Sequence, residues 1–168
     1  MKNNTRLRFL IEAALIAALY AVLTYVCSLF GLAYGSVQFR ISEALTLLPV
    51  LTPAAIPGLT LGCVLANLGS VFGPADMLFG GLATLLAAIA TRLTRRLQWR
   101  RIPWLAPLFP VLFNSLIVGF EISWFLPEGF SWSAFGWSAL SIGIGEFVIC
   151  YALGVPLCLA LEKTPLFK

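Results

Sequence analysis

The residues able to do chemistry are few in this chain and stand out against an apolar background. The stretch YGSVQFRISEAL, Tyr34–Leu45, places Arg40 and Glu43 three residues apart between two long apolar runs. Ionisable groups in apolar segments are costly and usually face a partner or a water-filled cavity. The candidate carboxylates are therefore Glu43, Asp76, Glu121 and Glu146.

Two amides within the apolar segments, Asn67 and Asn114, could complete a binding site, because an amide both donates and accepts hydrogen bonds. Each of these candidates has a structural alternative. The amides could instead join two helices, contributing about 1 kcal/mol each. Glu43 and Asp76 could sit at helix N-termini, where the helix dipole favours negative charge. Glu121 is close enough to a span end to reach the interface.

Several enzyme classes lack their required residues here. The chain has no histidine, so the commonest general base and metal ligand are both missing. It has no GxxxxGK[ST] phosphate-binding loop and no HExxH motif. The four cysteines are scattered without CxxC spacing, and we interpret them as packing residues. We predict no metal site, no cofactor and no catalytic residue.

Composition places these residues in a membrane protein. Hydrophobic residues make up 60% of the 168 residues and charged residues only 11%, against about 25% charged in soluble domains. The mean hydropathy is +0.96. We predict an all-α integral membrane protein with one transmembrane domain over residues 1–168.

The positions of the apolar runs and prolines predict six spans. A helix needs about 20 apolar residues to cross the hydrocarbon. Pro49, Pro53 and Pro57 disfavour helix where they fall, so Glu43–Leu51 is expected to form a short or broken second span before a turn near Thr52–Pro53. The other expected spans are Leu7–Phe30, Ala54–Phe72, Asp76–Leu97, Pro103–Phe125 and Ala134–Glu162.

Charge sets the expected orientation. With six spans, every lysine and arginine except Arg40 falls on one side of the membrane. The positive-inside rule then places both termini in the cytoplasm. All the polar candidates consequently map to the outer half or the midplane, which indicates a pocket open to the outside.

The first span carries a stripe of small residues. Ala13, Ala17 and Ala21 repeat every four residues in its inner half. Small side chains at this spacing let another helix approach closely. That helix could belong to a partner or to the same chain.

The stretch Tyr34–Leu68, YGSVQFRISEALTLLPVLTPAAIPGLTLGCVLANL, together with FGGLATLLAA over Phe79–Ala88, resembles the QueT family. The C-terminal half resembles it only in span pattern and in Glu146. This family comprises substrate-binding (S) components of energy-coupling factor (ECF) transporters, assigned to uptake of queuosine precursors.

The resemblance implies a six-helix S-component bundle in the bacterial cell membrane. Such a protein captures its substrate outside and docks on a membrane scaffold subunit driven by two ATPase subunits, so that ATP is used by the partners. Ala13, Ala17 and Ala21 match the docking stripe of such proteins. The alternatives are an S component for another vitamin-like molecule and a ligand-free membrane assembly protein.

A 7-deazaguanine ligand would present N–H donors along one edge. Glu43 or Glu146 could accept them, and we expect Glu43, rather than Arg40, to touch the ligand. Asn67 or Asn114 could read the ring carbonyl. Phe39 or Trp137 could stack on the ring, which is worth about 1–3 kcal/mol. The carboxylate of Asp76 or Glu121 could meet the cation of an aminomethyl precursor. Arg40 and Glu43 could pair at i,i+3, and the loop that contains Gln38, Arg40 and Glu43 is expected to close the pocket.

Overall fold

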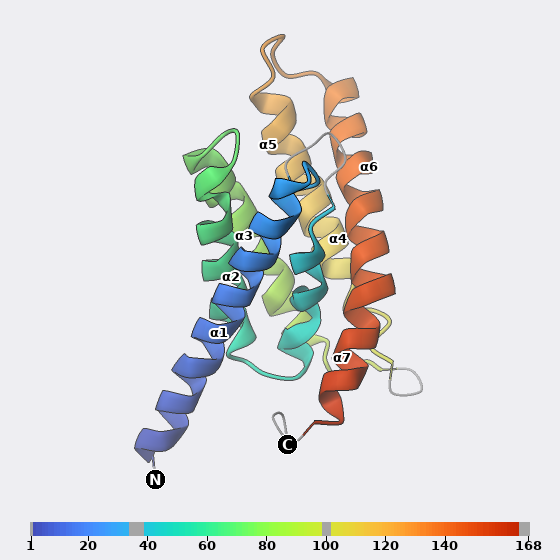
Figure 1. The fold of residues 1–168 in the computed structure, drawn as a ribbon. Helices are drawn as coiled ribbons and strands as arrows, with labels where there is room; N and C mark the ends of the chain where they lie inside the picture. The colour runs from blue at the N-terminus through green and yellow to red at the C-terminus, as the bar shows by residue number, and fades with distance from the viewer. Residues whose placement is uncertain (1, 34–38, 99–101, 165–168) are drawn as a thin grey trace.

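The computed structural model describes residues 2–33, 39–98 and 102–164. These residues form six helical units that run alternately toward opposite ends of the bundle (Figure 1). The units are α1 (Lys2–Leu29), η1 (Ile41–Val50), α2 (Ala55–Ala66) with η2 (Asn67–Gly69), α3 (Pro74–Leu93), α4 (Leu108–Phe113) with η3 (Asn114–Val118) and α5 (Gly119–Trp124), and α6 (Trp132–Ile149) with η4 (Cys150–Gly154) and α7 (Val155–Glu162). The all-α prediction is confirmed for this part of the chain.

Three of the six units are long and apolar enough to cross a membrane. They are Asn4–Leu29, Pro74–Leu93 and Trp132–Glu162. The other three, Ile41–Val50, Ala55–Gly69 and Leu108–Trp124, are apolar but shorter. The six predicted spans thus correspond to six helical units, of which only three have the length of a full span.

The short unit η1 contains Pro49 and is wound as a 3-10 helix. A 3-10 helix rises about 2.0 Å per residue, against 1.5 Å for an α-helix. Its ten residues therefore extend about 20 Å, which partly compensates for their small number. The predicted turn after it is present, because the next helix begins at Ala55.

Several predicted span ends were wrong by a few residues. The third unit ends at Gly69 instead of Phe72, because Ser70 adopts an extended conformation with a ψ of 167°. The fifth unit begins at Leu108 instead of Pro103. Helix is disfavoured just before a proline, and Pro107 directly precedes this unit.

The chain termini and two of the helix connections lie at opposite ends of the bundle. The N-terminal end of α1 and the C-terminal end of α7 lie at the same end (Figure 1). The α2–α3 and α5–α6 connections lie at the opposite end, which we call the connection end. The cytoplasmic orientation of the termini stays a prediction.

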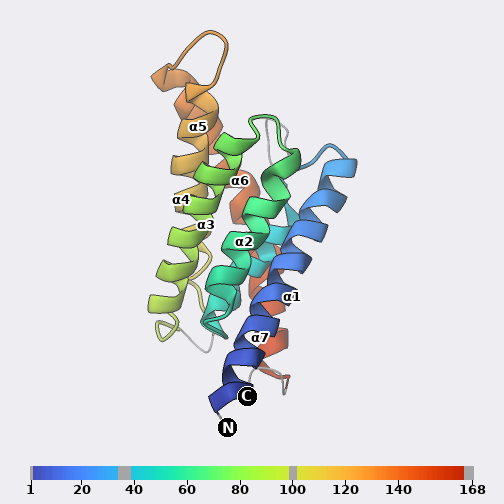
Figure 2. The same ribbon diagram turned by 90° about the vertical axis from the view of Figure 1, so that its left-hand side faces the viewer.

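A small-residue seam holds α1 against α2, which lies between α1 and α3 (Figure 2). A Cβ added to Gly58 would lie 2.8 Å from the carbonyl oxygen of Ala13. One added to Gly62 would lie 2.9 Å from the carbonyl oxygen of Ala17. The seam, defined by Ala13, Ala17, Gly58 and Gly62, therefore brings two backbones together as closely as glycine permits.

This seam changes the interpretation of the alanine stripe. Ala17 is 3% exposed and Ala21 is 9% exposed, so α2 and its neighbours already cover them. Two of the three stripe residues therefore pack within the chain, as the alternative interpretation allows, and Ala13 is half-buried. A docking role for the stripe stays a prediction. The exposed alanines of α1 are Ala14 and Ala18, which lie between the stripe positions.

Candidate functional site

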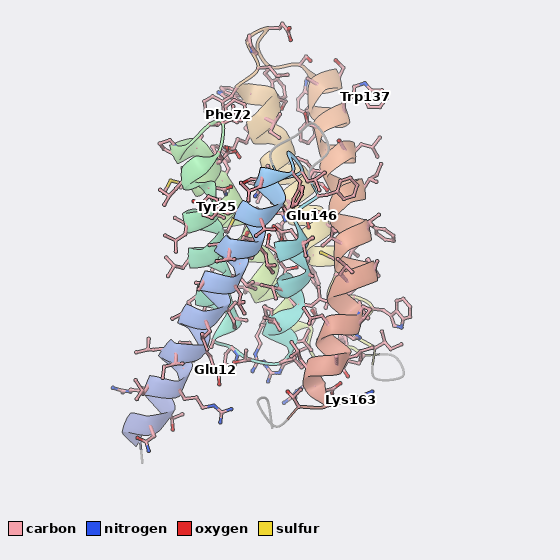
Figure 3. The ribbon with its side chains drawn as sticks, viewed as in Figure 1. Glu12, Tyr25, Phe72, Trp137, Glu146 and Lys163 are labelled. Atoms are coloured by element: carbon pink, nitrogen blue, oxygen red, sulfur yellow. The ribbon has the colours of Figure 1, made fainter. Side chains whose placement is uncertain are left out.

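A small polar cavity lies where η1, α2, α3, η3 and α6 meet. Its polar lining consists of Arg40, Glu43, Thr84, Asn114 and Glu146. Figure 3 shows Glu146 near the middle of the bundle's height. The cavity volume is about 10 Å³, which is the room that one water molecule needs.

Glu43 is brought into the cavity by the first turn of η1 and is almost fully buried. The Tyr20 hydroxyl of α1 donates a hydrogen bond to its Oε1 atom. Its Oε2 atom has no partner among the described residues. The carboxylate is therefore held on one side and open to a further donor on the other.

Glu146 faces Glu43 from α6 and is held by the neighbouring helix. The Asn114 amide Nδ2 donates to Glu146 Oε1 at 2.8 Å. The Cys150 thiol lies 3.6 Å from Oε2. Asn114 and Cys150 are the first residues of the π-helical segments η3 and η4. Such π-bulges occur frequently at functional sites.

Arg40 supplies the positive charge of the cavity. It occupies the cap position before η1, and its Nε donates to the carbonyl oxygen of Ala33 at 2.9 Å. Its charge acts on both Glu43 and Glu146. A buried cation offsets part of the cost of burying two carboxylates. A direct Arg40–Glu43 pairing stays a prediction.

Asp76, Glu121 and Asn67 form a second polar group nearer the connection end. The backbone N–H of Phe72 donates to Asp76 Oδ2 at 3.1 Å, and Asn67 Nδ2 donates to the Asp76 carbonyl oxygen at 3.0 Å. Asp76 lies in the first turn of α3, the helix N-terminal position that was the structural alternative for it. Asn67 joins α2 to α3, which was the structural alternative for the amides. Glu121 is fully buried next to Asp76, so it does not reach an interface.

The candidate stacking residues lie away from this cavity. The Trp137 side chain is 74% exposed and points away from the bundle (Figure 3). Phe39 is half-buried and does not line the cavity. Gln38 lies outside the described residues.

Sequence reasoning missed Tyr20, which touches the central carboxylate. A signal for it existed in the first helix. Tyr20 and Thr24 are four residues apart, on one face of a segment otherwise rich in alanine and leucine. Thr24 Oγ1 lies 2.7 Å from Ser42 Oγ, so this face of α1 packs on the start of η1.

The unpartnered atoms of both polar groups share one chemical property. In the described part of the chain, four buried side-chain atoms lack a hydrogen-bond partner: Glu43 Oε2, Asn67 Oδ1, and Glu121 Oε1 and Oε2. Every one is an acceptor when the carboxylates are ionised. An unsatisfied buried polar group costs about 1–3 kcal/mol. The site is therefore suited to a ligand rich in N–H donors.

A bundle of apolar helices, three of them long enough to span a membrane, surrounds a buried cavity rich in acceptors. This arrangement is compatible with the class of membrane proteins that bind a small polar molecule. Comparison with known proteins narrows this class. Residues 10–163 match the model of the family described as QueT transporter, and the chain belongs to this family. The predicted family resemblance is confirmed.

A curated relative carries a more specific name. The chain is 38% identical over 77 residues to the protein named Queuosine precursor transporter QueT of Lactococcus lactis subsp. cremoris (strain MG1363). The alignment covers 46% of this chain and 45% of the relative, so it spans about half of each. No solved structure matches the chain.

Proposed function

We propose that this chain is the S component of an ECF transporter and that it binds a queuosine precursor with a 7-deazaguanine ring. Family membership and the name of the relative support a transporter for such a precursor. The observation that carries the ligand class is the unpartnered Glu43 Oε2 in a cavity with a second carboxylate, Glu146. A 7-deazaguanine ring brings N–H donors along one edge, which carboxylates accept strongly.

Each polar residue of the cavity has a role in this proposal. Glu43 accepts ring N–H groups through Oε2 while Tyr20 holds Oε1 in place. Asn114 holds Glu146, which supplies the second carboxylate. Arg40, as the cation of the cavity lining, is the donor suited to the ring carbonyl oxygen.

Binding must enlarge the cavity. Small-molecule sites usually measure about 300–1,000 Å³, whereas this one has a volume of about 10 Å³. A ligand of ring size therefore requires the surrounding helices or side chains to move apart. The ligand then selects the wider arrangement, because only that arrangement can contact it.

Transport in this proposal depends on partners. The chain lies in the bacterial cell membrane as a multi-pass protein with cytoplasmic termini, captures substrate from outside, and docks on a membrane scaffold subunit with two ATPase subunits. The exposed face of α1 is the docking candidate, since Ala14 and Ala18 are exposed there. Ala18→Leu is expected to abolish co-purification with the scaffold subunit while ligand binding persists; retained co-purification would exclude this face.

The binding proposal is tested by calorimetry on the purified full chain in detergent, with 7-deazaguanine as the probe. The wild-type chain should bind it, and Glu43→Gln should bind at least about tenfold more weakly, because it replaces a charged acceptor. The matched control is Glu128→Gln, since Glu128 is exposed in the α5–α6 connection.

Other outcomes point to the alternatives. Affinity for a vitamin but for no 7-deazaguanine would replace the proposed substrate. If Glu146→Gln altered thermal stability while uptake stayed unchanged, the cavity would be structural, as in a ligand-free assembly protein.

A further inference from the structure

A long apolar groove lies between α1 and α7, away from the polar cavity. Its volume is about 720 Å³. Leu45 and Leu48 of η1 are buried at its base, and the half-buried Leu157 and Leu161 of α7 form one wall. Figure 1 shows that the N-terminal half of α1 leans away from α7, which leaves this groove between the two helices.

The α1 wall of the groove carries one large apolar side chain per helical turn. Leu7, Ile11, Leu15 and Leu19 are spaced by four residues and are 50–59% exposed. Residues at this spacing lie on one face of a helix. A hydrocarbon chain in the groove contacts apolar side chains on three sides, from α1, η1 and α7, and so gains more dispersion contacts than it would on a flat surface.

The groove matches one leaflet of a bilayer in length. Asn4 and Leu19, its end residues on α1, lie about 22 Å apart along the helix at 1.5 Å per residue. Half of a bilayer, with its headgroup region, is about 20–22 Å thick. A lipid of a single leaflet can therefore lie along the whole groove, with its headgroup at one end.

The groove is polar only at the end that carries the chain termini, which we call the terminal end. Asn4, Arg8 and Glu12 line it there, and its other lining residues among those described are leucine and isoleucine. Both Glu12 oxygens accept hydrogen bonds: Arg8 Nε donates to Oε1 at 2.8 Å and Thr52 Oγ1 donates to Oε2 at 2.9 Å. Glu12 thus holds the guanidinium at the mouth of the groove, where the Arg8 side chain is still 61% exposed.

The terminal end is also basic as a whole. Among the described residues there, two side chains are acidic, Glu12 and Glu162, whereas six are basic: Arg6, Arg8, Arg92, Arg95, Arg96 and Lys163. Figure 3 shows Glu12 and Lys163 at this end. Basic sites between apolar helices bind the phosphate-bearing headgroups of anionic lipids. The charge at this end of the groove is therefore complementary to an anionic headgroup.

We propose that the groove binds an anionic phospholipid, with one acyl chain along Leu7–Leu19 and its phosphate at Arg8. The lipid comes from the leaflet at the terminal end. A zwitterionic phospholipid has the same chains, but its ammonium group offsets the phosphate charge, so it is the weaker ligand. This inference rests on the proposed function, which places the chain in a membrane, and it adds a ligand site separate from the polar cavity.

The first test compares dioleoyl phosphatidylglycerol with dioleoyl phosphatidylcholine, which share their acyl chains and differ in headgroup charge. Native mass spectrometry on the full chain in detergent should show about fivefold tighter binding of phosphatidylglycerol, the effect of one basic side chain. Arg8→Gln should bring the ratio of the two affinities close to one. The matched control is Arg6→Gln, which should keep the wild-type ratio, because Arg6 is exposed on the same helix and does not line the groove.

The second test concerns the acyl chain. Leu15→Trp places a larger side chain in the groove and should weaken the binding of both lipids several-fold. Leu10→Trp is its control, because Leu10 is 64% exposed on α1, much as Leu15 is at 59%, and does not line the groove. Glycerol 1-phosphate, which carries the phosphate without the chains, should displace neither lipid.

Each result has a stated consequence. Equal wild-type affinities for the two lipids, or an Arg8→Gln variant with the full preference, would overturn the headgroup site. Equal lipid binding by Leu15→Trp and Leu10→Trp would overturn the groove as the place of the acyl chain. Displacement by glycerol 1-phosphate would replace the lipid site by a site for free phosphate.

The proposed function is judged on a different measurement. Calorimetry with 7-deazaguanine on Leu15→Trp should give the wild-type affinity, because Leu15 does not line the polar cavity. A wild-type chain that preferred phosphatidylglycerol but bound no 7-deazaguanine would overturn the proposed substrate and support the lipid groove. Normal 7-deazaguanine binding without a lipid preference would overturn the groove alone.

Discussion

The small-residue seam and the polar cavity are neighbouring regions built on opposite principles. In the seam, Gly58 and Gly62 leave no space between α1 and α2, and backbone lies against backbone. In the cavity, Glu43 lies among polar side chains with one acceptor atom unsatisfied. The seam gains its stability from close packing, whereas the cavity gives up stability to keep acceptors ready for a ligand.

Tyr20 connects the two regions. Its Cβ lies 2.8 Å from where a Cβ of Gly62 would sit, and its hydroxyl donates to Glu43. The residue is fully buried. The closeness of α1 to α2 therefore fixes the position of a hydroxyl that orients the central carboxylate. Changes in the seam should affect both stability and binding, whereas changes in the cavity should affect mainly binding.

The largest expected effect is that of Gly62→Leu in the seam. A Cβ there would lie 2.8–3.0 Å from Tyr20 and from the Ala17 backbone, and backbone cannot give way cheaply. Overpacking of this kind should lower the free energy of unfolding by about 3 kcal/mol or more. The thermal midpoint in detergent measures it, with Gly136→Leu as control, because nothing lies within 4 Å of a Cβ at Gly136. Equal losses in both variants would show that the seam is not tightly packed.

The next effect should come from Asn114→Leu, which keeps the approximate side-chain size but removes the donor to Glu146 Oε1. The carboxylate loses a charge-assisted hydrogen bond worth about 1.5–3 kcal/mol. We expect 7-deazaguanine binding to weaken by about tenfold or more, measured by calorimetry. Unchanged affinity would mean that Glu146 does not contact the ligand.

Tyr20→Phe should produce a smaller effect because it removes only the hydroxyl and keeps the ring in the seam. Glu43 would then have no partner on either oxygen unless Arg40 or a ligand supplies one. We expect a loss of about 1–2 kcal/mol in unfolding free energy and weaker binding, measured on the same sample. A Tyr20→Phe variant that lost stability but bound the ligand normally would show that Tyr20 does not orient Glu43 for binding.

The sequence was informative where charge and proline stand out from an apolar chain. The six predicted spans correspond to six helical units, and the second is short, as predicted, because proline has a local effect on the backbone. The sequence also placed Glu43, Asn114 and Glu146 among the candidates, and all three line one cavity. A sequence can identify each of these residues as a candidate. Whether their side chains face the same cavity depends on how each helix is rotated about its axis.

The same limit explains the misplaced residues. Ala13, Ala17 and Ala21 match the docking stripe that the family resemblance implies, yet Gly58 and Gly62 of α2 already pack against Ala13 and Ala17 within the chain. The sequence contained both halves of this seam, but periodicity alone does not pair them. Trp137 was considered for stacking, but its side chain faces outward.

The smallest expected effect concerns the Arg8–Glu12 ion pair, which lies beside the N-terminal end of the seam. Arg8 Nε lies 2.8 Å from Glu12 Oε1, but the arginine side chain is 61% exposed. Exposed ion pairs contribute about 0–1 kcal/mol and are screened by salt. Arg8→Gln should therefore change the thermal midpoint only slightly, and less at 1 M than at about 0.1 M salt. Glu12 keeps its second contact in this variant, because Thr52 Oγ1 donates to Oε2 at 2.9 Å. A loss as large as that of Gly62→Leu would mean that charge, and not close packing, holds α1 in place, and the contrast between seam and cavity would then need revision.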